Sequence, residues 1–595
     1  MQRLGSLLGT FFCVLTACIV ARADELRDRS PVDLALTPDE AWLITVNQTS
    51  DTISLVNVTQ AKVADELACG RHPSAIAISK DGRRVFVTGA YSGTLDLFDL
   101  ADGRLASAGS VELGFHPVGV ALSPDGRLAY VALEAAAAVA VVDVNEQRVI
   151  DQIEVGRWPR YLALSPDGSR LAVGTSGDQS VSVVDTASRK LLFQERLQGI
   201  NLGQMVASAD GQYVYFPWMI YRQNPIDPRN IQAGWVLGSR IARVRLDGPA
   251  RRQAMTLDER GKAVADPHGI GLTSDEAWLV ASASGTHELL VYRTEGLVLQ
   301  DFGGPGDHID PRLVHDDRRY YRVPLGGRPM GLRIARDDRR VFVSNYLSNA
   351  VQVVDLDERQ VIQTIELGGP REPSLVRRGE AIFYDAQRSL DQWYSCHSCH
   401  YDGGTNATVM DTLNDGSIRT FKTVLPLRNL PRTAPWTWHG WQQDLGAAMR
   451  KSLSETMQGP RPSDDDVAAL VAYFSSLDAP PNPYRVGKAA LSEAGERGRQ
   501  VFESEKAGCA NCHRGPYFTD GEIHDVGTGS NRDAYDGYNT PSLVGVHGRV
   551  RLLHDGRAKS LDELLTGPHN PDQVTGAGEL TEAERADLIE YLKSL

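Results

Sequence analysis

Two five-residue strings, at 396–400 and 509–513, carry the most specific chemistry in this sequence. They read Cys-His-Ser-Cys-His and Cys-Ala-Asn-Cys-His. Cys-x-x-Cys-His is the attachment signature of c-type haem, because two thiols can bond to the haem vinyl groups while the adjacent imidazole reaches the iron. The expected attachment residues and proximal ligands of two covalently bound haem c groups are Cys396, Cys399 and His400 for the first haem and Cys509, Cys512 and His513 for the second.

The same strings have two alternative interpretations, a redox Cys-x-x-Cys pair and a zinc knuckle. The His that follows the second Cys in both copies favours haem over either alternative. The N-terminus points the same way, since it predicts export: Arg3 precedes an apolar run, and Ala21-Arg22-Ala23 offers a cleavage site. We expect a signal peptide over residues 1–23 and a location in the bacterial periplasm. An alternative is a lipoprotein, since Leu15-Thr16-Ala17-Cys18 resembles a lipobox; only lipidation at Cys18 would then tie the chain to a membrane.

Composition excludes some partners and some folds. With 595 residues the chain should contain several domains. Its formal charge of −14 and pI near 5.5 argue against nucleic acid and against an anionic membrane surface as partners. After the signal, Cys69 is the one Cys outside the haem motifs, so no disulfide framework is expected.

The elements before the haem motifs form an internal repeat over residues 31–368. Its marker is a four-residue turn, found at 37–40, 79–82, 123–126, 165–168, 208–211, 273–276 and 335–338. The early copies recur every 42 to 44 residues and are followed by alternating apolar strands, as in the four-stranded blades of a propeller. We therefore predict a seven-bladed, all-β propeller with insertions at about Pro217–Ser239 and Gly303–Arg322. The repeats resemble YVTN-type β-propellers.

A second marker, Gly-x-x-Pro, opens several blades and places His72, His116 and Trp158 at equivalent positions. These residues could form a docking surface around the central channel. The interpretation we favour from the sequence is packing between blades.

Two similar units follow a Gly- and Pro-rich linker, at residues 374–479 and 488–595. Each has a helical segment, a haem motif, irregular loops and a closing helix, at 464–477 and 582–595. The sequence thus predicts two α-helical, cytochrome c-like haem domains after the propeller, each of about 100 residues.

The second unit resembles dihaem bacterial cytochrome c peroxidases and the related MauG enzymes, through Asn539-Thr540-Pro541-Ser542-Leu543 and His554-Asp555-Gly556-Arg557. In that family the sixth iron ligand follows about one helix later, where this chain has His569. The resemblance implies a six-coordinate electron-transfer haem held by His513 and His569. The alternative is that His569 is a surface loop residue.

The first unit resembles the same family through Arg428-Asn429-Leu430-Pro431 and the Trp-rich string 436–441. This implies that Trp438 is an aromatic relay between the irons, where the alternative is a core aromatic residue. The family's Asp and Arg are replaced here by His439 and Trp441. The resemblance also implies a calcium ion between the units, held by Asn429 and by carbonyls near Thr540 and Pro541.

The open question in the first unit is the group that faces its iron. The family places a peroxide-handling Glu about twenty residues after the relay Trp, which suggests Glu455 as the general acid/base. Met457 is the competing prediction, since a thioether there would close the iron, and His439 is a third candidate ligand.

These resemblances imply a dihaem peroxidase or MauG-like oxidase. It would use hydrogen peroxide to oxidise a small electron-donor protein or a protein substrate, docked with help of the propeller. The alternative is a non-enzymatic electron-transfer cytochrome in which both haems are six-coordinate.

Overall fold

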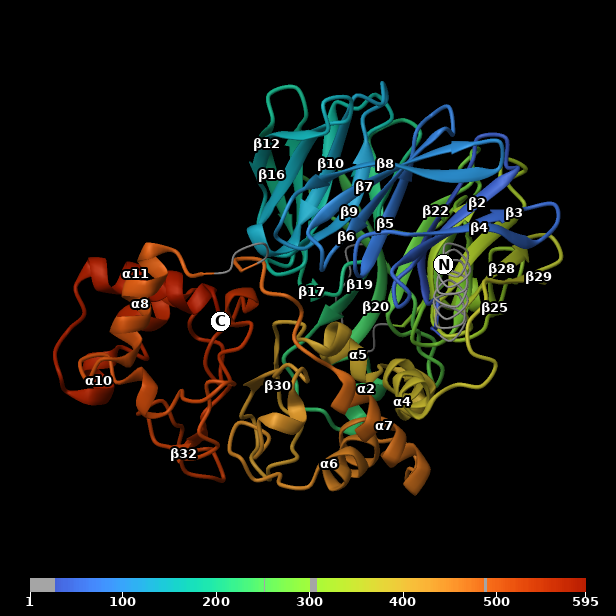
Figure 1. Cartoon of the computed structure of the whole chain (residues 1–595). Coiled ribbons are helices and arrows are strands. Elements are labelled where there is room, and N and C mark those ends of the chain that lie inside the picture. The colour runs from blue at the N-terminus through green and yellow to red at the C-terminus, as the bar shows by residue number, and fades with distance from the viewer. Residues whose placement is uncertain (1–26, 251, 300–307, 486–489) are drawn as a thin grey trace, which may run out of the picture.

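A computed structural model describes residues 27–250, 252–299, 308–485 and 490–595. The predicted signal peptide and Cys18 lie outside the described residues. The described part forms a β-propeller followed by two smaller units that lie together against one end of it (Figure 1). Within the described ranges, no helix is both long and apolar enough to cross a membrane.

Seven antiparallel sheets form the propeller, as the repeat predicted. Blades one to four consist of β1–β4 (Pro31–Leu36, Trp42–Asn47, Thr52–Asn57, Lys62–Ala68), β5–β8 (Pro73–Ile78, Arg84–Gly89, Thr94–Ala101, Arg104–Glu112), β9–β12 (Pro117–Leu122, Leu128–Leu133, Ala138–Asp143, Arg148–Glu154) and β13–β16 (Pro159–Leu164, Arg170–Thr175, Ser180–Asp185, Lys190–Arg196). Blades five to seven consist of β17–β21 (Gly199–Ile200, Val206–Ala207, Tyr213–Tyr221, Leu237–Arg245, Gln253–Thr256), β22–β25 (Pro267–Leu272, Trp278–Ala283, Glu288–Arg293, Tyr320–Pro324) and β26–β29 (Pro329–Ile334, Arg340–Asn345, Ala350–Asp355, Gln360–Glu366). β1 packs beside both β5 and β26, which closes the ring.

The repeated turn works in the same way in successive blades. In the third blade the Ser123 hydroxyl donates to Asp125, and the Asp125 carboxylate accepts the backbone N–H of Arg127. Gly126 adopts a φ of 70°, which glycine reaches without steric cost. The turn therefore joins the two inner strands of a blade tightly, and the alternating apolar residues on both strands pack against neighbouring blades.

The first expected insertion is shorter than the sequence suggested. Strands β19 and β20 extend into it and pair from Tyr213–Arg245 to Tyr221–Leu237. The remaining loop carries helix α2 (Pro228–Gln232). Long apolar strands explain the difference, because they continue the blade beyond its usual end. The second insertion carries α3 (Pro311–Val314) within its described part.

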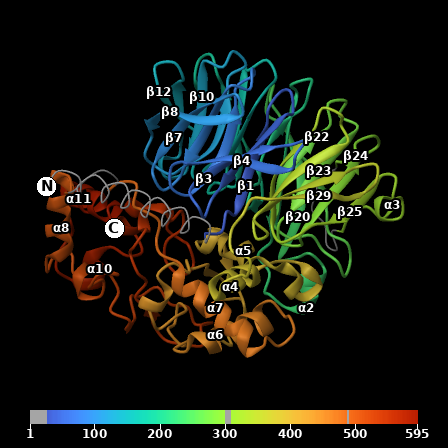
Figure 2. The ribbon, with the colours of Figure 1, turned by 45° about the vertical axis from the view of Figure 1, so that its right-hand side comes forward.

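The two units after the propeller contain short helices joined by long loops. The first has α4 (Leu375–Tyr384), α5 (Cys396–Cys399), β30 (Val409–Met410), β31 (Lys422–Thr423), α6 (Leu445–Lys451), a π-helical turn (Ser452–Thr456) and α7 (Asp464–Ser476). The second has α8 (Glu493–Glu503), a 3₁₀ turn (Cys509–Asn511), β32 (Ile523–His524), β33 (Tyr538–Asn539), α9 (Leu561–Thr566), α10 (Pro571–Thr575) and α11 (Glu582–Lys593). Figure 2 shows the first unit directly beneath the propeller and the second unit beside the first.

In both units a glycine allows the opening helix to touch the closing helix. A Cβ on Gly379 of α4 would lie 1.9 Å from the backbone oxygen of Ala469 in α7. A Cβ on Gly498 of α8 would lie equally close to the backbone oxygen of Asp587 in α11. The two units thus use the same helix crossing, which agrees with the sequence repeat between them.

Candidate functional site

The two Cys-x-x-Cys-His motifs orient their histidines in the same way. His400 Nδ1 lies 2.9 Å from the carbonyl oxygen of Leu425, and His513 Nδ1 lies 3.1 Å from that of Phe518. The carbonyl accepts a hydrogen bond from Nδ1–H, so Nε2 of each imidazole keeps the free lone pair that an iron ligand needs. Burial lowers the pKa of both histidines to about 4, which keeps them neutral and able to bind metal.

The thiols lie in apolar surroundings that suit haem. Cys396 and Cys399 pack against the large cluster between blade five and the first unit, and Cys509 packs against the core of the second unit. Burial raises the pKa of Cys396 and Cys399 to about 12. A reactive redox pair needs the opposite shift, so the redox alternative is disfavoured.

The zinc alternative is also weak. Among the described residues, the one group of three ligand atoms close enough to share a metal is Cys512, Asp520 and His524. It contains a single thiol from a motif, whereas a zinc knuckle uses both. Both motifs therefore fit haem c.

A cavity of about 690 Å³ begins at the first motif and reaches the propeller. In the first unit it is lined by His400, by the loop around Asp411 and by aromatic residues that include Trp438. On the propeller side it is lined by His72, His116, Trp158, Arg160, His268 and Arg328. The space beside His400 thus continues into a polar chamber between the unit and the end of the propeller.

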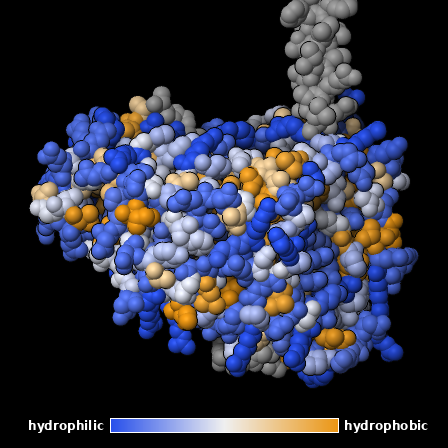
Figure 3. Space-filling model, turned by 90° about the horizontal axis from the view of Figure 1, so that it is seen from below, coloured by the Kyte–Doolittle hydropathy of each residue, from blue (hydrophilic) through white to orange (hydrophobic). Residues whose placement is uncertain are grey.

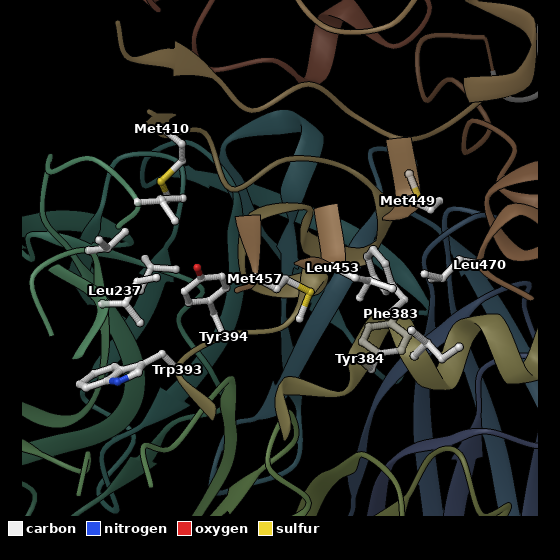
Figure 4. Packing of buried hydrophobic residues seen from close by; sticks show 14 of the residues in the cluster. Leu237, Phe383, Tyr384, Trp393, Tyr394, Met410, Met449, Leu453, Met457 and Leu470 are labelled. Carbon is white, nitrogen blue, oxygen red and sulfur yellow. The ribbon is translucent and has the colours of Figure 1, made fainter. Parts of the chain in front are cut away.

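Two of the three residues predicted to face the first iron, Glu455 and Met457, do not line this cavity. Glu455 is exposed, and its carboxylate is 3.0 Å from Lys451 Nζ. Its neighbours Ser452 and Thr456 do line the cavity, on the opposite side of the π-helical turn. Met457 is buried with its Sδ 3.7 Å from Cys396 Sγ, and Figure 4 shows it packed near Tyr394 and Leu453.

Sequence reasoning missed three residues that do line the cavity. Asp411 is 2% exposed, and burial raises the pKa of its carboxyl group. Met410 and Met449 also line the cavity and are buried. No motif marks these residues. The position of Met410 and Asp411 depends on how their loop packs, since the Asp411 carbonyl accepts the N–H of Ile226 from blade five, and Met449 lies in α6.

Trp438 is buried at the junction of the two units. Its indole N–H donates to the Thr423 carbonyl at 2.8 Å, and its own carbonyl accepts the N–H of Asn539 from the second unit at 2.7 Å. Its ring lies 6.2 Å from that of His554. Trp438 therefore touches the first cavity and the second unit at once, as a relay would. His439, the third candidate ligand, also lines the cavity, with Nδ1 2.8 Å from the carbonyl of Gly537.

His569 precedes α10 in the second unit and is largely buried. Its Nδ1 is buried with no hydrogen-bond partner in the structure, and desolvation lowers the pKa of the imidazole. His569 lies near enough to contribute to the lowered pKa of His513. A buried imidazole without a protein partner fits a role as iron ligand opposite His513.

The residues named for calcium are partly occupied by protein contacts. The Thr540 carbonyl accepts the Thr519 hydroxyl at 2.6 Å, while Asn429 lines the cavity together with Pro541. The amide oxygen of Asn539 is buried with no hydrogen-bond partner in the structure. An oxygen of this kind is a ligand that calcium prefers.

In each blade, one non-glycine residue with a left-handed backbone conformation lies at the end of the propeller that faces the two units. These residues have φ between 50° and 58°, a region that costs a non-glycine residue roughly 1–2 kcal/mol. They are Ser30, His72, His116, Trp158, Asn201, Asp266 and Arg328. Six directly precede the innermost strand of a blade, and the residue of blade five lies between β17 and β18. We call these seven residues the docking ring.

The docking ring holds the first unit at its haem motif. Asp266 accepts hydrogen bonds at 2.6 Å from the hydroxyls of both Ser395 and Ser398. Asn201 donates to the Ser398 carbonyl at 2.9 Å. Arg328 forms an ion pair of 3.0 Å with the Asp402 carboxylate. Helix α5 and the turn that follows it are thus fixed by three blades at once.

The other ring residues reach the rest of the haem units. Ser30 accepts a hydrogen bond from Arg377 of α4 at 3.0 Å. Nε2 of His116 lies 2.9 Å from the carbonyl of Pro481, and the Trp158 indole donates to Gly548 of the second unit at 2.9 Å. His72 stacks on Tyr91, and the Tyr91 hydroxyl accepts from Arg428. The sequence-based preference for packing between blades is therefore wrong for His116 and Trp158, whose side chains contact the chain beyond the propeller, whereas His72 packs on Tyr91 of its own blade.

Comparisons with known proteins agree with this architecture. Hydrazine synthase subunit gamma of Kuenenia stuttgartiensis is 29% identical over 278 residues, which cover 38% of this chain and 79% of the relative. Methylamine utilization protein MauG of Methylorubrum extorquens is 25% identical, with coverage of 38% and 79%. Cytochrome-c peroxidase IdrP2 of Denitromonas iodatirespirans is 24% identical, with coverage of 41% and 87%.

A solved chain of Kuenenia stuttgartiensis hydrazine synthase aligns with 55% of this chain and 96% of its own length, at 24% identity and a TM-score of 0.49. No protein-family model matches the sequence. Hydrazine synthase subunit gamma, MauG and cytochrome-c peroxidases are therefore among the proteins that this chain resembles. The resemblance seen in the sequence is therefore confirmed, together with its fusion to a seven-bladed propeller.

Proposed function

We propose that this protein is a periplasmic dihaem c-type cytochrome acting as a peroxidase or MauG-like oxidase. Residues 374–479 and 488–595 would be its two cytochrome c-like domains, the first peroxidatic and the second for electron transfer. The homologues support an oxidoreductase of this family. Haem at both motifs is supported by the neutral, carbonyl-oriented imidazoles of His400 and His513.

The observation that carries the proposal is the cavity beside His400. It extends from the histidine into a polar chamber, and neither Met457 nor Glu455 lines it. The first haem would fill the part of this cavity beside His400. An enzyme of this class also needs the space that continues toward the propeller, because peroxide must reach the iron before its O–O bond is broken. Haem c supplies the redox-active iron for that reduction.

The side chains around the cavity have separable roles in this proposal. His400 holds the iron, and the Leu425 carbonyl fixes the orientation of its ring. Asp411 moves a proton between the two peroxide oxygens, since burial keeps its pKa above the usual value and it faces the cavity. Glu455 stays the competing prediction from the sequence. Trp438 passes electrons between the units, and His513 with His569 holds the second haem.

The source of electrons would be a small redox protein or a protein substrate. The end of the propeller with the docking ring already holds the haem units, so an external partner would bind elsewhere. Figure 3 shows scattered small apolar groups in a mainly hydrophilic surface on the side of the haem units. This surface suits a transient, polar contact with a redox partner better than a permanent apolar interface. A calcium ion near Asn429 and Thr540 stays a prediction.

Met410 and Met449 favour a second candidate function. Either thioether could close the first iron, since both line the cavity. Figure 4 shows them at opposite ends of the buried cluster, away from Met457. Ligation by either would produce an electron-transfer cytochrome with two six-coordinate haems.

The test is the reaction of the full-length holoprotein with hydrogen peroxide. We expect stoichiometric peroxide to change the optical spectrum of one haem, and a reduced small c-type cytochrome to restore it with turnover. The diferric and half-reduced proteins are both measured, because the second haem can control access to the first. A protein unreactive in both states contradicts the peroxidase and leaves the electron-transfer cytochrome.

A further inference from the structure

A stack of rings connects the first cavity to the interior of the second unit. The Tyr538 ring lies on that of His554, with centroids 4.0 Å apart and planes at 16°. On its other side Tyr538 lies 4.8 Å from His439. The His554 ring is 6.2 Å from Trp438, which lines the cavity. Tyr538 is therefore one ring removed from the proposed relay.

The phenol of Tyr538 has a base at hydrogen-bond distance. Its hydroxyl donates to Asp533 Oδ2 at 3.0 Å and lies 3.0 Å from His554 Nε2. The other oxygen of Asp533 accepts from Lys422 Nζ at 3.0 Å. That ammonium group keeps the carboxylate ionised, so the phenol hydrogen points to Asp533 and His554 can donate to the phenol oxygen. Tyr538 is 7% exposed, so water does not compete for these contacts.

We propose that Tyr538 is a redox-active residue that gives one electron toward Trp438 while its proton passes to Asp533. The proposal rests on the proposed function, because hydrogen peroxide is the oxidant. Peroxide takes up two electrons and two protons in forming two molecules of water. Tyr538 supplies one of these electrons, the external donor supplies the other, and the two protons come from water in the cavity. At Tyr538 the O–H bond breaks, an O–H bond forms on Asp533, and a neutral tyrosyl radical remains. An electron from the external donor and the proton from Asp533 restore the phenol.

The geometry favours Tyr538 over its neighbour Tyr535. A phenol that loses an electron becomes a strong acid, so a base already in hydrogen-bond contact allows the electron and the proton to leave together. Tyr535 also stacks on His439, at 5.6 Å, but its side chain is 41% exposed. It belongs to the same loop and provides a matched control.

The experiment compares the wild-type holoprotein with Tyr538→Phe and Tyr535→Phe. Each is mixed with hydrogen peroxide, frozen, and examined by electron paramagnetic resonance, while a parallel optical measurement follows the haems. We expect the signal of an organic radical in the wild type and in Tyr535→Phe, and its loss in Tyr538→Phe. Incorporation of ring-deuterated tyrosine should narrow this signal. The optical change of the haem should remain in all three. An unchanged radical in Tyr538→Phe, or one insensitive to the label, overturns the proposal.

A second measurement needs no variant. In D₂O the wild-type radical should form more slowly, because the O–H proton moves with the electron; equal rates in H₂O and D₂O overturn the proton-coupled step. Failure of the proposed function is distinguishable, since the wild-type haem spectrum would then not respond to peroxide. In that case a flash-generated ruthenium(III) complex serves as the one-electron oxidant. Loss of the radical in Tyr538→Phe alone then supports the proposal, and equal radicals in all three proteins contradict it.

Discussion

At the scale of single residues, two carboxylates compete for the role of proton carrier. Asp411 is buried in the cavity wall, whereas Glu455 is exposed and paired with Lys451. A proton-transfer group must come within hydrogen-bond reach of the reacting atoms. We therefore expect Asp411→Asn to slow the haem reaction with peroxide by about 10²- to 10⁴-fold, the usual contribution of such a group. Stopped-flow absorbance measures this rate.

Glu455→Gln is the matched control, since it removes the same charge from the same unit. It should leave the rate unchanged. If Glu455→Gln carries the loss and Asp411→Asn does not, the prediction from the sequence was right and Asp411 only shapes the loop. Circular dichroism of both variants shows whether the fold is retained.

The sequence was informative about residues whose roles depend on short spacing. Both haem motifs fit within five residues, so their chemistry could be recognised without a structure. Asp411 and Met410 could not be recognised, because they line the cavity only after their loop has packed against blade five, and Met449 lines it from helix α6.

At the scale of elements, the paired helices of each unit depend on a glycine crossing. An added methyl at Gly498 would overlap the backbone oxygen of Asp587, and backbone cannot move aside as a flexible side chain can. We expect Gly498→Ala to lower the free energy of unfolding of the second unit by about 1–3 kcal/mol, as overpacking does. Thermal unfolding monitored at the Soret band would report it.

Gly495→Ala in the same helix is the control. The nearest atoms to its added methyl belong to side chains, first the Ser492 hydroxyl at 3.2 Å, which caps the helix, and not to the backbone of a partner helix. A Gly498→Ala protein as stable as Gly495→Ala would mean that the helices separate without cost and that the crossing does not hold the unit.

The sequence predicted the blades of the propeller, but it did not predict how the propeller contacts the units that follow it. Seven repeated turns were enough to predict seven blades, since each turn joins strands that are close in the chain. The Gly-x-x-Pro marker revealed equivalent positions, but not what covers them. Only the structure shows that Asp266 and Arg328 join His72, His116 and Trp158 in one ring.

At the scale of the whole molecule, buried histidines make the docking of propeller and haem units sensitive to acid. Burial lowers the pKa of His72 to about 4 and that of His268 to about 3, from an ordinary 6.5. As pH falls through 6.5, the unfolded chain binds protons that the folded chain still excludes. The contribution of these neutral histidines to the free energy of unfolding is therefore complete above about pH 6.5 and is lost progressively as pH falls toward 4.

We expect the melting temperature of the holoprotein to fall between pH 7.5 and 4.5, at a cost on the order of 1–3 kcal/mol per histidine. His72→Gln, which cannot be protonated, should show a smaller decrease over the same range. Identical pH dependence in the two proteins would mean that His72 takes up its proton without disturbing the interface.

The most direct test of the account is the coordination of the two irons in the diferric holoprotein. Electron paramagnetic resonance distinguishes an iron with an open face, which is high-spin, from one with two strong ligands, which is low-spin. A peroxidase of the proposed kind should give one signal of each kind, and His569→Ala should convert the low-spin signal to high spin. Two low-spin signals in the wild-type protein would contradict this proposal, since the first iron would then be closed to peroxide.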